Sequence, residues 1–387
     1  MSTIKTNAIL DASGGNTTTI NGTTPTAYNT MGKNLIINGA MEIAQRGTSS
    51  SGLTSGAYRT VDRVKSSVNR NELIFTEEQS TDAPAGFFNS FKYTVTTAET
   101  TVDANDFFQI EYHIEGHNTQ QLDWGTSDAK TITLSFWAKS SSTGVFPVTI
   151  SNSGGDRHYP TSYTINSANT WEKKEITVTG STSGTWLTGT NIGVSLRIGC
   201  ALGSTYTGAT ANQWLNSSGF ANAFVTQTNN VMTTTNATWQ ITGLQLEVGS
   251  VATEFERRPY TTELQLCQRY YEKSYNIGTV PGTNTTTGIA GYIVMANSTT
   301  SLANNGTNAV VFKVYKRTTP TITTYDSVGN SGKLSYAPAG IGRQDNITSG
   351  VHRQAEGGFG VYTTSASSLT AGQAVEQFHQ WTADAEL

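Results

Sequence analysis

The side chains of this sequence that are best suited to hold a ligand are aromatic. Trp124, Trp186, Trp214 and Tyr206 lie in stretches rich in glycine, serine and threonine, and Trp137 lies on the non-core register of a strand-like stretch. Aromatic rings stack on the apolar faces of sugars, while neighbouring Asn, Asp or Gln side chains bond to the hydroxyls. We therefore take these five residues as candidate glycan contacts. The alternative for each of them is a place in a hydrophobic core or in a subunit contact.

Three titratable residues stand at alternate positions of one strand-like stretch. His113, Glu115 and His117 would point to the same side of that strand and could hold a metal ion. The alternative, which we adopt, is the polar outer face of an antiparallel sheet, so we predict no metal and no cofactor. Two pairs of aspartates could cap a calcium site, but we interpret them as ordinary loop residues: Asp103 with Asp106, and Asp123 with Asp128.

The sequence lacks the short motifs of common hydrolases and nucleotide-binding enzymes. It has no Gly-x-Ser-x-Gly, no His-Glu-x-x-His and no phosphate-binding glycine loop. A glycan-cleaving enzyme would need two carboxylates about 5 to 9 Å apart, and a sequence alone neither shows nor excludes such a pair. We predict that the protein is not an enzyme and has no catalytic residues.

The composition excludes several other classes of function. Charged residues make up 13% of the 387 residues, against roughly 25% in an average soluble protein. A formal net charge of -4 provides no basic footprint for nucleic acid. No apolar run approaches the ~18 residues that a membrane-spanning helix needs, and the first residues lack the pattern of a secretory signal. We predict no nucleic-acid binding and no membrane insertion, and we interpret Cys200 and Cys267 as free thiols.

Period-two alternation predicts a mostly antiparallel β structure. Apolar residues alternate with polar ones over Phe108–Ile114 and again over Ile132–Ala138, so these apolar side chains should point into a core. Leu35–Ile37 reads as a further strand, followed by a turn at Asn38 and Gly39. Strands separated by turn-rich gaps and long connections favour a sandwich of the jelly-roll type.

One short helix is predicted after the strand that ends near Val248. Pro259 disfavours helix at the residue before it, so the helix should begin just after this proline, with Thr261 or Thr262 as its cap. Leu264, Cys267 and Tyr271 share one face of it at helical spacing. A helix of about three turns is too short to stand alone. It must pack either on its own chain or on copies of itself around a symmetry axis.

Several stretches resemble bacteriophage tail fibre and related tail proteins. The resemblance is best over residues 34 to 275 and includes Tyr58, Asp62 and Arg63, although Val64 stands where many relatives carry Trp. The matching stretches are NLIINGAMEIAQRG, QIEYHIEG, TLSFWAKS, LQLEVGSVATEFERRPY, LCQRYY and, at the C-terminus, EQFHQWTADAEL. What the resemblance implies is a module similar to carbohydrate-binding modules, usually assembled in trimers, with a leading segment held by the virion.

We therefore expect an all-β homotrimer in four parts. Residues 1–33 are expected to anchor the chain to phage tail or adaptor proteins, and residues 34–256 to form a jelly-roll domain. Residues 257–275 are expected to form a linking helix, with Leu264, Cys267 and Tyr271 as its contact face, and residues 276–387 a second β-sandwich.

The function expected from this organisation is attachment without catalysis. As a tail fibre, the protein would be made in the cytoplasm of the bacterial host and would be part of the virion. It would bind a glycan or another receptor on the bacterial surface. An alternative is a structural part of a baseplate, neck or head fibre that binds another virion protein, and a third is a glycan hydrolase. A glycan-binding measurement separates the first two functions, because a protein that only binds other virion proteins should bind no glycan.

Overall fold

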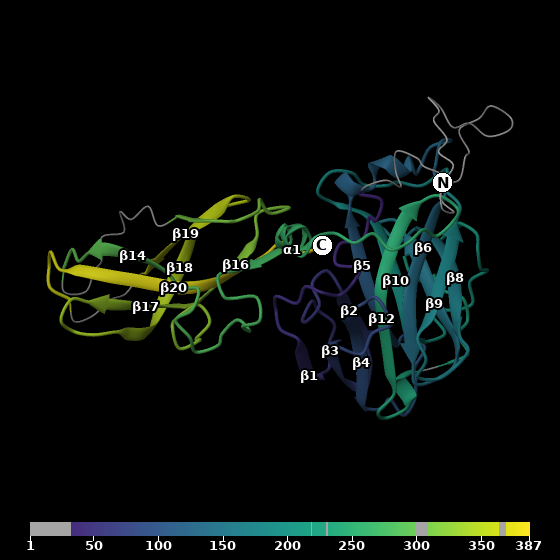
Figure 1. Cartoon of the computed structure of the whole chain (residues 1–387), viewed down its shortest axis with the longest axis horizontal. Helices are drawn as coiled ribbons and strands as arrows, with labels where there is room; N and C mark the ends of the chain where they lie inside the picture. The colour runs from purple at the N-terminus through teal and green to yellow at the C-terminus, as the bar shows by residue number, and fades with distance from the viewer. Residues whose placement is uncertain (1–31, 218, 230, 299–308, 364–368) are drawn as a thin grey trace, which may run out of the picture.

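The computed structural model describes residues 32–217, 219–229, 231–298, 309–363 and 369–387. Nearly all of the expected anchoring segment 1–33 thus lies outside the described residues. The described chain forms two lobes, with the helix α1 and the C-terminus between them (Figure 1). Apart from α1 and three short 3₁₀ turns, the regular elements in these residues are strands, which confirms the all-β class. No helix in the described part is long and apolar enough to cross a membrane.

The first lobe is a sandwich of two antiparallel six-stranded sheets. The strands β4, β5, β6 and β7 lie alternately in the two sheets, a connection pattern that is typical of a jelly roll. In spatial order, the first sheet contains β1 (Ser49–Leu53), β3 (Ile74–Ser80), β4 (Ser90–Thr97), β12 (Thr238–Val248), β6 (Ile132–Ser140) and β9 (Glu172–Val178). The second contains β11 (Leu215–Asn216), β8 (Arg157–Ile165), β7 (Gly144–Ser151), β10 (Ile192–Leu202), β5 (Phe107–Glu115) and β2 (Lys65–Asn69).

The core of this lobe lies between the two sheets, as the alternation predicted. The apolar residues of β5 and β6 belong to one continuous buried cluster: Phe108, Ile110, Tyr112 and Ile114, with Ile132, Leu134, Phe136 and Ala138. Trp239 of β12 is fully buried in the same cluster, and its indole N–H donates to the hydroxyl of Tyr163 at 2.7 Å. Burial of these apolar side chains is the main driving force that holds the sheets face to face.

The opposite face of β5 differs from the prediction of a solvated polar surface. Glu111, His113 and Glu115 are 8%, 4% and 1% exposed. A loop covers part of this face, since the ring centroid of Phe220 lies 3.9 Å from the guanidinium of Arg197. Arg269, directly after α1, covers another part and pairs with Glu115 at 2.6 Å. Burial works against the charge of Glu111, but the hydrogen bond with His113 and the charge of Arg197 outweigh it and lower the pKa of this carboxyl.

The segment after Lys33 is not the predicted strand. Leu35 donates one backbone hydrogen bond to the carbonyl of Leu246 at 2.9 Å, but residues 34–37 form no strand with β12. Instead the side-chain oxygen of Asn34 accepts hydrogen bonds from the backbone N–H groups of Ile36 and Leu246, at 2.9 and 3.0 Å. These bonds replace the backbone hydrogen bonds of a strand pair. The turn was predicted correctly, because Asn38 has φ +60°.

The helix α1 (Tyr260–Gln268) begins directly after Pro259, as predicted, but neither threonine caps it. It also ends earlier than expected. Tyr271 lies in β13 (Tyr271–Lys273), which pairs with the last strand of the second lobe instead of continuing the helix. Strand pairing therefore fixes the end of the helix, a long-range contact that local periodicity cannot show.

The predicted contact face of this helix packs against the chain's own first lobe. Leu264 and Cys267 join Ile37 and Ile43 in one small cluster, and Cys267 is 1% exposed. Tyr271 lies under the guanidinium of Arg46, with its ring centroid 3.7 Å away. Of the two alternatives for the helix, the structure shows packing within the chain. This face does not offer Cys267 to another subunit.

The second lobe is one hydrogen-bonded antiparallel sheet, where a second sandwich was expected. The last strand of this sheet, β20 (Ala374–Asp384), is central, because it pairs with two short strands along each of its edges. The strands are β13, β14 (Ala290–Met295), β15 (Ala309–Val311), β16 (Thr321–Tyr325), β17 (Lys333–Pro338), β18 (Gln344–Ala355), β19 (Gly358–Thr363) and β20 (Ala374–Asp384). The strand β18 was not predicted, since its sequence lacks apolar alternation.

Buried charges join the two lobes. Arg63 forms an ion pair with Glu386, and its guanidinium lies 3.6 Å from the ring centroid of Tyr270. Burial opposes the charge of Arg63, but Glu386 outweighs it and raises the pKa of Arg63. Arg46 lies 3.0 Å from Asp384. The end of the chain is therefore fixed to the first lobe, and the junction is a packed interface and not a free linker.

Candidate functional site

Three of the five candidate aromatics meet at one end of the first lobe. Trp124 follows the 3₁₀ turns η1 (Gly116–Asn118) and η2 (Gln120–Leu122), Trp186 lies between β9 and β10, and Trp214 directly precedes β11. Their ring centroids are 4.7, 5.2 and 5.6 Å apart in pairs, and the rings are steeply inclined to one another. This edge-to-face geometry is favourable for aromatic rings. Residues spread over about ninety positions of the sequence thus form one cluster.

Hydrogen bonds fix all three indoles in place. The N–H groups of Trp124, Trp186 and Trp214 donate to the backbone carbonyls of Lys130, Ser183 and Thr179, at 2.8, 3.1 and 2.7 Å. The two loops that carry Trp124 and Trp186 are also bonded to each other, since the amide of Gly125 donates to the carbonyl of Ser181 at 2.7 Å. Because the N–H groups are used, only the rings remain for a ligand. Trp124 is 8% exposed and belongs to the main core cluster, while Trp186 and Trp214 are partly buried against that cluster.

Two glycines allow this close packing. Gly125 has φ +90° and Gly184 has φ +93°, a region that side chains rarely adopt. A Cβ at Gly125 would lie 3.1 Å from Cδ1 of Trp186, and one at Gly184 would lie 3.0 Å from Cγ of Arg157. Both positions therefore need glycine for backbone conformation and for space.

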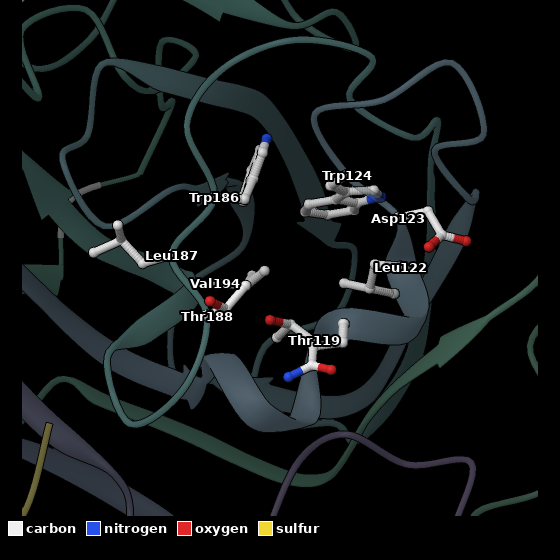
Figure 2. A pocket seen from close by; sticks show the side chains of 9 residues that line it. Thr119, Leu122, Asp123, Trp124, Trp186, Leu187, Thr188 and Val194 are labelled. Atoms are coloured by element: carbon white, nitrogen blue, oxygen red, sulfur yellow. The ribbon is translucent and has the colours of Figure 1, made fainter.

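A pocket of about 400 Å³ opens between Trp124 and Trp186. Small-molecule sites in proteins measure ~300–1,000 Å³, so the pocket has room for a sugar ring. Figure 2 shows the two indole rings on one side of the opening and Thr119 on the other, with Leu122 and Val194 between them. The pocket thus combines aromatic walls with an aliphatic floor.

Polar side chains surround this apolar pocket. Asp123 has the left-handed backbone conformation, with φ +52°, and its carboxylate pairs with Lys130 at the outer edge. The exposed side chain of Gln120 has no hydrogen-bond partner among the described residues, and the hydroxyl of Thr188 is exposed on the lining. Such groups can bond to the hydroxyls of a sugar whose apolar face lies on a ring.

Trp214 supports the pocket without lining it. Its ring packs against Tyr159, with centroids 5.3 Å apart, and against the other two indoles. Arg157 lies over the same ring at 5.6 Å. Burial raises the pKa of the Tyr159 hydroxyl and lowers the pKa of the Arg157 guanidinium. Trp214 is a packing residue here and not a direct ligand contact.

Trp137 lies elsewhere, on the outward face of the first sheet. It lines a second pocket of about 390 Å³ together with Phe87, Phe255 and Arg257. The guanidinium of Arg257 lies 5.0 Å from the ring centroid of Phe87. Unlike the three clustered indoles, the N–H of Trp137 has no partner in the part of the chain that the structure describes, so it is free to donate to a ligand.

Tyr206, the fifth candidate, belongs to neither pocket. Its ring packs edge-on against Phe107, with centroids 5.4 Å apart. Both residues border a small buried cluster formed by Leu202, Ala223 and Phe224. Tyr206 is therefore a partly buried side chain that packs on this cluster, outside both pockets.

The sequence did not reveal the aliphatic floor of the first pocket or its polar rim. Leu122 and Asp123 could have been found, because the run Leu-Asp-Trp-Gly directly precedes a turn. Val194 and Thr188 carried no signal, since their place depends on the pairing of β10 with β5. Among the described residues no group of three His, Cys, Asp or Glu side chains could hold a metal ion.

Comparisons with known proteins do not establish a family. No protein-family model matches the sequence, and no curated protein matches it significantly. Solved structures that match part of this chain include the enzymatically active domain of tailspike protein 4 from bacteriophage CBA120, at 12% identity and a TM-score of 0.29 over 51% of this chain. This chain covers 21% of that tailspike chain, about a fifth of its length.

Carbohydrate-binding modules are also among the similar structures. One is the family 11 module from Clostridium thermocellum in complex with a mixed-linked tetrasaccharide, at 13% identity and a TM-score of 0.27, covering 52% of this chain and all of the module. A family 4 module shows 13% identity and a TM-score of 0.28 over 55% of this chain and 98% of its own. At such scores nothing about the ligand of this chain follows from these likenesses.

Proposed function

We propose that this protein is a non-catalytic phage tail fibre that attaches the virion to a bacterial surface glycan, and that the pocket between Trp124 and Trp186 holds a sugar ring. The observation that carries the proposal is the pocket itself. Two indoles line it, with their N–H groups bonded to backbone carbonyls: Trp186 is partly exposed and Trp124 is 8% exposed, and both stand beside an aliphatic floor. Polar side chains such as Gln120 border that floor, and a sugar ring has the same combination of apolar face and polar edge.

The absence of catalysis is part of the proposal. The lining of this pocket contains one carboxylate, Asp123, and that group is paired with Lys130 at the rim. Hydrolysis of a glycosidic bond normally uses two carboxylates on either side of the bond. A site with one engaged carboxylate is suited to binding.

The place on the virion rests on the resemblance of residues 34 to 275 to tail fibre proteins. In this proposal residues 1–33 bind the tail or an adaptor, and three copies of the chain form one fibre. A single pocket with a small apolar contact binds weakly. Linking several weak sites raises the avidity by ~10²–10⁴-fold, which is the advantage of a trimer for attachment.

A glycan array probed with the full chain tests the proposal, with two variants as matched partners. Trp186→Ala removes one wall of the pocket and should lower binding at least ~10-fold, because the stacking face is lost. Trp171→Ala removes a partly exposed indole outside the pocket, whose N–H bonds to Asp82 at 3.1 Å, and should leave binding unchanged. Failure of the folded full chain to bind any glycan would contradict the proposal.

A second candidate is a structural virion component, and the second lobe favours it. Ile293, Val311 and Tyr315 are 74%, 76% and 72% exposed, so they are available for contact with another protein. Such residues would be covered if this lobe binds another virion protein. Cross-linking mass spectrometry on assembled particles separates the two candidates. Links from the second lobe to another virion protein, together with an empty glycan array, would support the structural role.

A further inference from the structure

The pocket beside Trp124 adjoins a larger groove. This groove measures about 800 Å³ and lies where the first lobe meets α1. It is lined by Leu35, Ile37 and Leu266 on its apolar side, and by the exposed His117 and Asn118 on its polar side. Gln120 lines both the groove and the Trp124 pocket. The two cavities are therefore neighbours separated by one exposed side chain.

The same groove also adjoins the pocket that contains Trp137. Arg257 lines the groove and also the pocket that contains Trp137 and Phe87. Its guanidinium is held in place, because it donates to the carbonyl of Gly86 and lies 5.0 Å from the ring centroid of Phe87. Three cavities thus follow one another across the lobe, joined by Gln120 and Arg257, with tryptophans at the two ends.

From this arrangement we infer that the ligand is a linear oligosaccharide of several units that runs from the Trp124 pocket through the groove to Trp137. The inference rests on the proposed function and extends it, because it names the length and the course of the glycan. A single terminal sugar would fill only the first cavity. A chain would occupy all three and would gain contacts with each further unit.

The chemistry of the groove suits the middle of such a chain. Its apolar wall, with Leu35, Ile37 and Leu266, can contact the ring faces, while Asn118 and His117 can reach the hydroxyls. The charge of Arg258 is already engaged, since its guanidinium donates to the carbonyl of Ile36 at 3.1 Å and pairs with Glu256 and Glu263. The groove therefore does not require a strongly anionic ligand.

The test compares affinities along length series of neutral oligosaccharides. The probes are cello-, xylo-, chito- and dextran oligosaccharides from disaccharide to hexasaccharide, titrated into the full chain by calorimetry. We expect the affinity for the best series to rise at least ~10-fold from disaccharide to hexasaccharide. Trp137→Ala should lower hexasaccharide affinity and leave disaccharide affinity unchanged, whereas Trp186→Ala should lower both.

A pair of variants on α1 tests the middle of the path. Thr262 is exposed and lines the groove, and Thr261 is equally exposed on the same helix but lies outside the lining. Thr262→Trp should block the groove and remove the gain with length, while Thr261→Trp should leave the gain intact. Neither change removes a hydrogen bond of the folded chain, so both variants should fold.

Each outcome has a separate meaning. Equal affinities for all lengths, or a Thr262→Trp variant that binds like the unmodified chain, would overturn the inference. In either case the proposed function would still be supported if disaccharides bind the unmodified chain and only Trp186→Ala abolishes that binding. No binding in any series would count against both.

Discussion

The two lobes bury their apolar side chains in different ways. In the first lobe one continuous cluster fills the space between two six-stranded sheets. In the second lobe the single sheet has two separate small clusters, one around Tyr336 and one around Trp381, and leaves Ile293 and Val311 largely exposed. A large closed core can hold long loops in fixed positions, and the three clustered tryptophans lie on such loops. A small core leaves more apolar side chains exposed, and a neighbour can contact them.

The junction compensates for the smaller core of the second lobe. Arg46 and Arg63 come from the first lobe, while Asp384 and Glu386 come from the end of the second. A buried ion pair adds little net stability by itself, but removal of one partner leaves an uncompensated charge. The second lobe therefore depends on the first through these contacts.

The sharpest test of the comparison is one substitution made in each lobe. Trp239→Ala should lower the free energy of unfolding of the first lobe by about 3–5 kcal/mol. Trp239 is fully buried, and the substitution also removes its hydrogen bond to the hydroxyl of Tyr163. Trp381→Ala should cost the second lobe at least ~1 kcal/mol less, because a small cluster collapses more easily around the missing ring. Hydrogen exchange read by mass spectrometry reports the two lobes separately. Equal losses would remove the distinction between the cores.

The next largest effect is expected at the junction. Arg63→Met removes one of the two cations that pair with the buried carboxylate of Glu386 and leaves Arg46, 3.4 Å away, as the other, so it should destabilise the chain by up to ~3 kcal/mol. Lys92→Met breaks an exposed pair with Glu78 and should cost less than ~1 kcal/mol. Denaturant unfolding measures both variants. If Arg63→Met lowers the stability of the first lobe alone, the two lobes are stable independently of each other.

A smaller effect, of opposite sign for one buried residue in each lobe, is expected from pH. Burial lowers the pKa of His379 in the second lobe to about 4, and burial raises the pKa of Glu77 in the first lobe to about 7. His379 is an imidazole whose folded pKa is below its ordinary 6.5, so its unfolded form takes up protons first as the pH falls. The second lobe should therefore lose up to ~3 kcal/mol between pH 6.5 and 4.

Glu77 behaves in the opposite way. Its folded pKa is above its ordinary 4.5, so the folded form takes up the proton first and this contribution grows as the pH falls from 7 to 4.5. His113 and His158 of the first lobe also have lowered pKa values, so the contribution of each residue is read from a variant. Hydrogen exchange at pH 7 and pH 5, corrected for the intrinsic exchange rate at each pH, should show that Glu77→Gln lowers the protection of the first lobe more at pH 5 than at pH 7. His379→Phe should reduce the loss of protection that the second lobe shows at pH 5. Variants that change protection equally at both pH values would contradict the assignment.

The sequence predicted those features that depend on neighbouring residues. The period of two along β5 and β6 placed Phe108 and Phe136 in the core, because successive side chains of a strand point to opposite faces. Pro259 set the start of α1, since it restricts the residue before it. The candidate contacts Trp124, Trp186 and Trp137 were found from ring chemistry and loop composition.

Only the tertiary structure decided which of these residues meet. Trp124 and Trp186 share a pocket because the pairing of β10 with β5 brings their loops to the same end of the lobe. A different long-range pairing, that of β13 with β20, ended α1 at Gln268. Covering loops buried Glu111 on a face that alternation had predicted to be solvated. Local patterns determine which side of an element is apolar. What covers the other side depends on contacts between residues far apart in the chain, and no local pattern contains them.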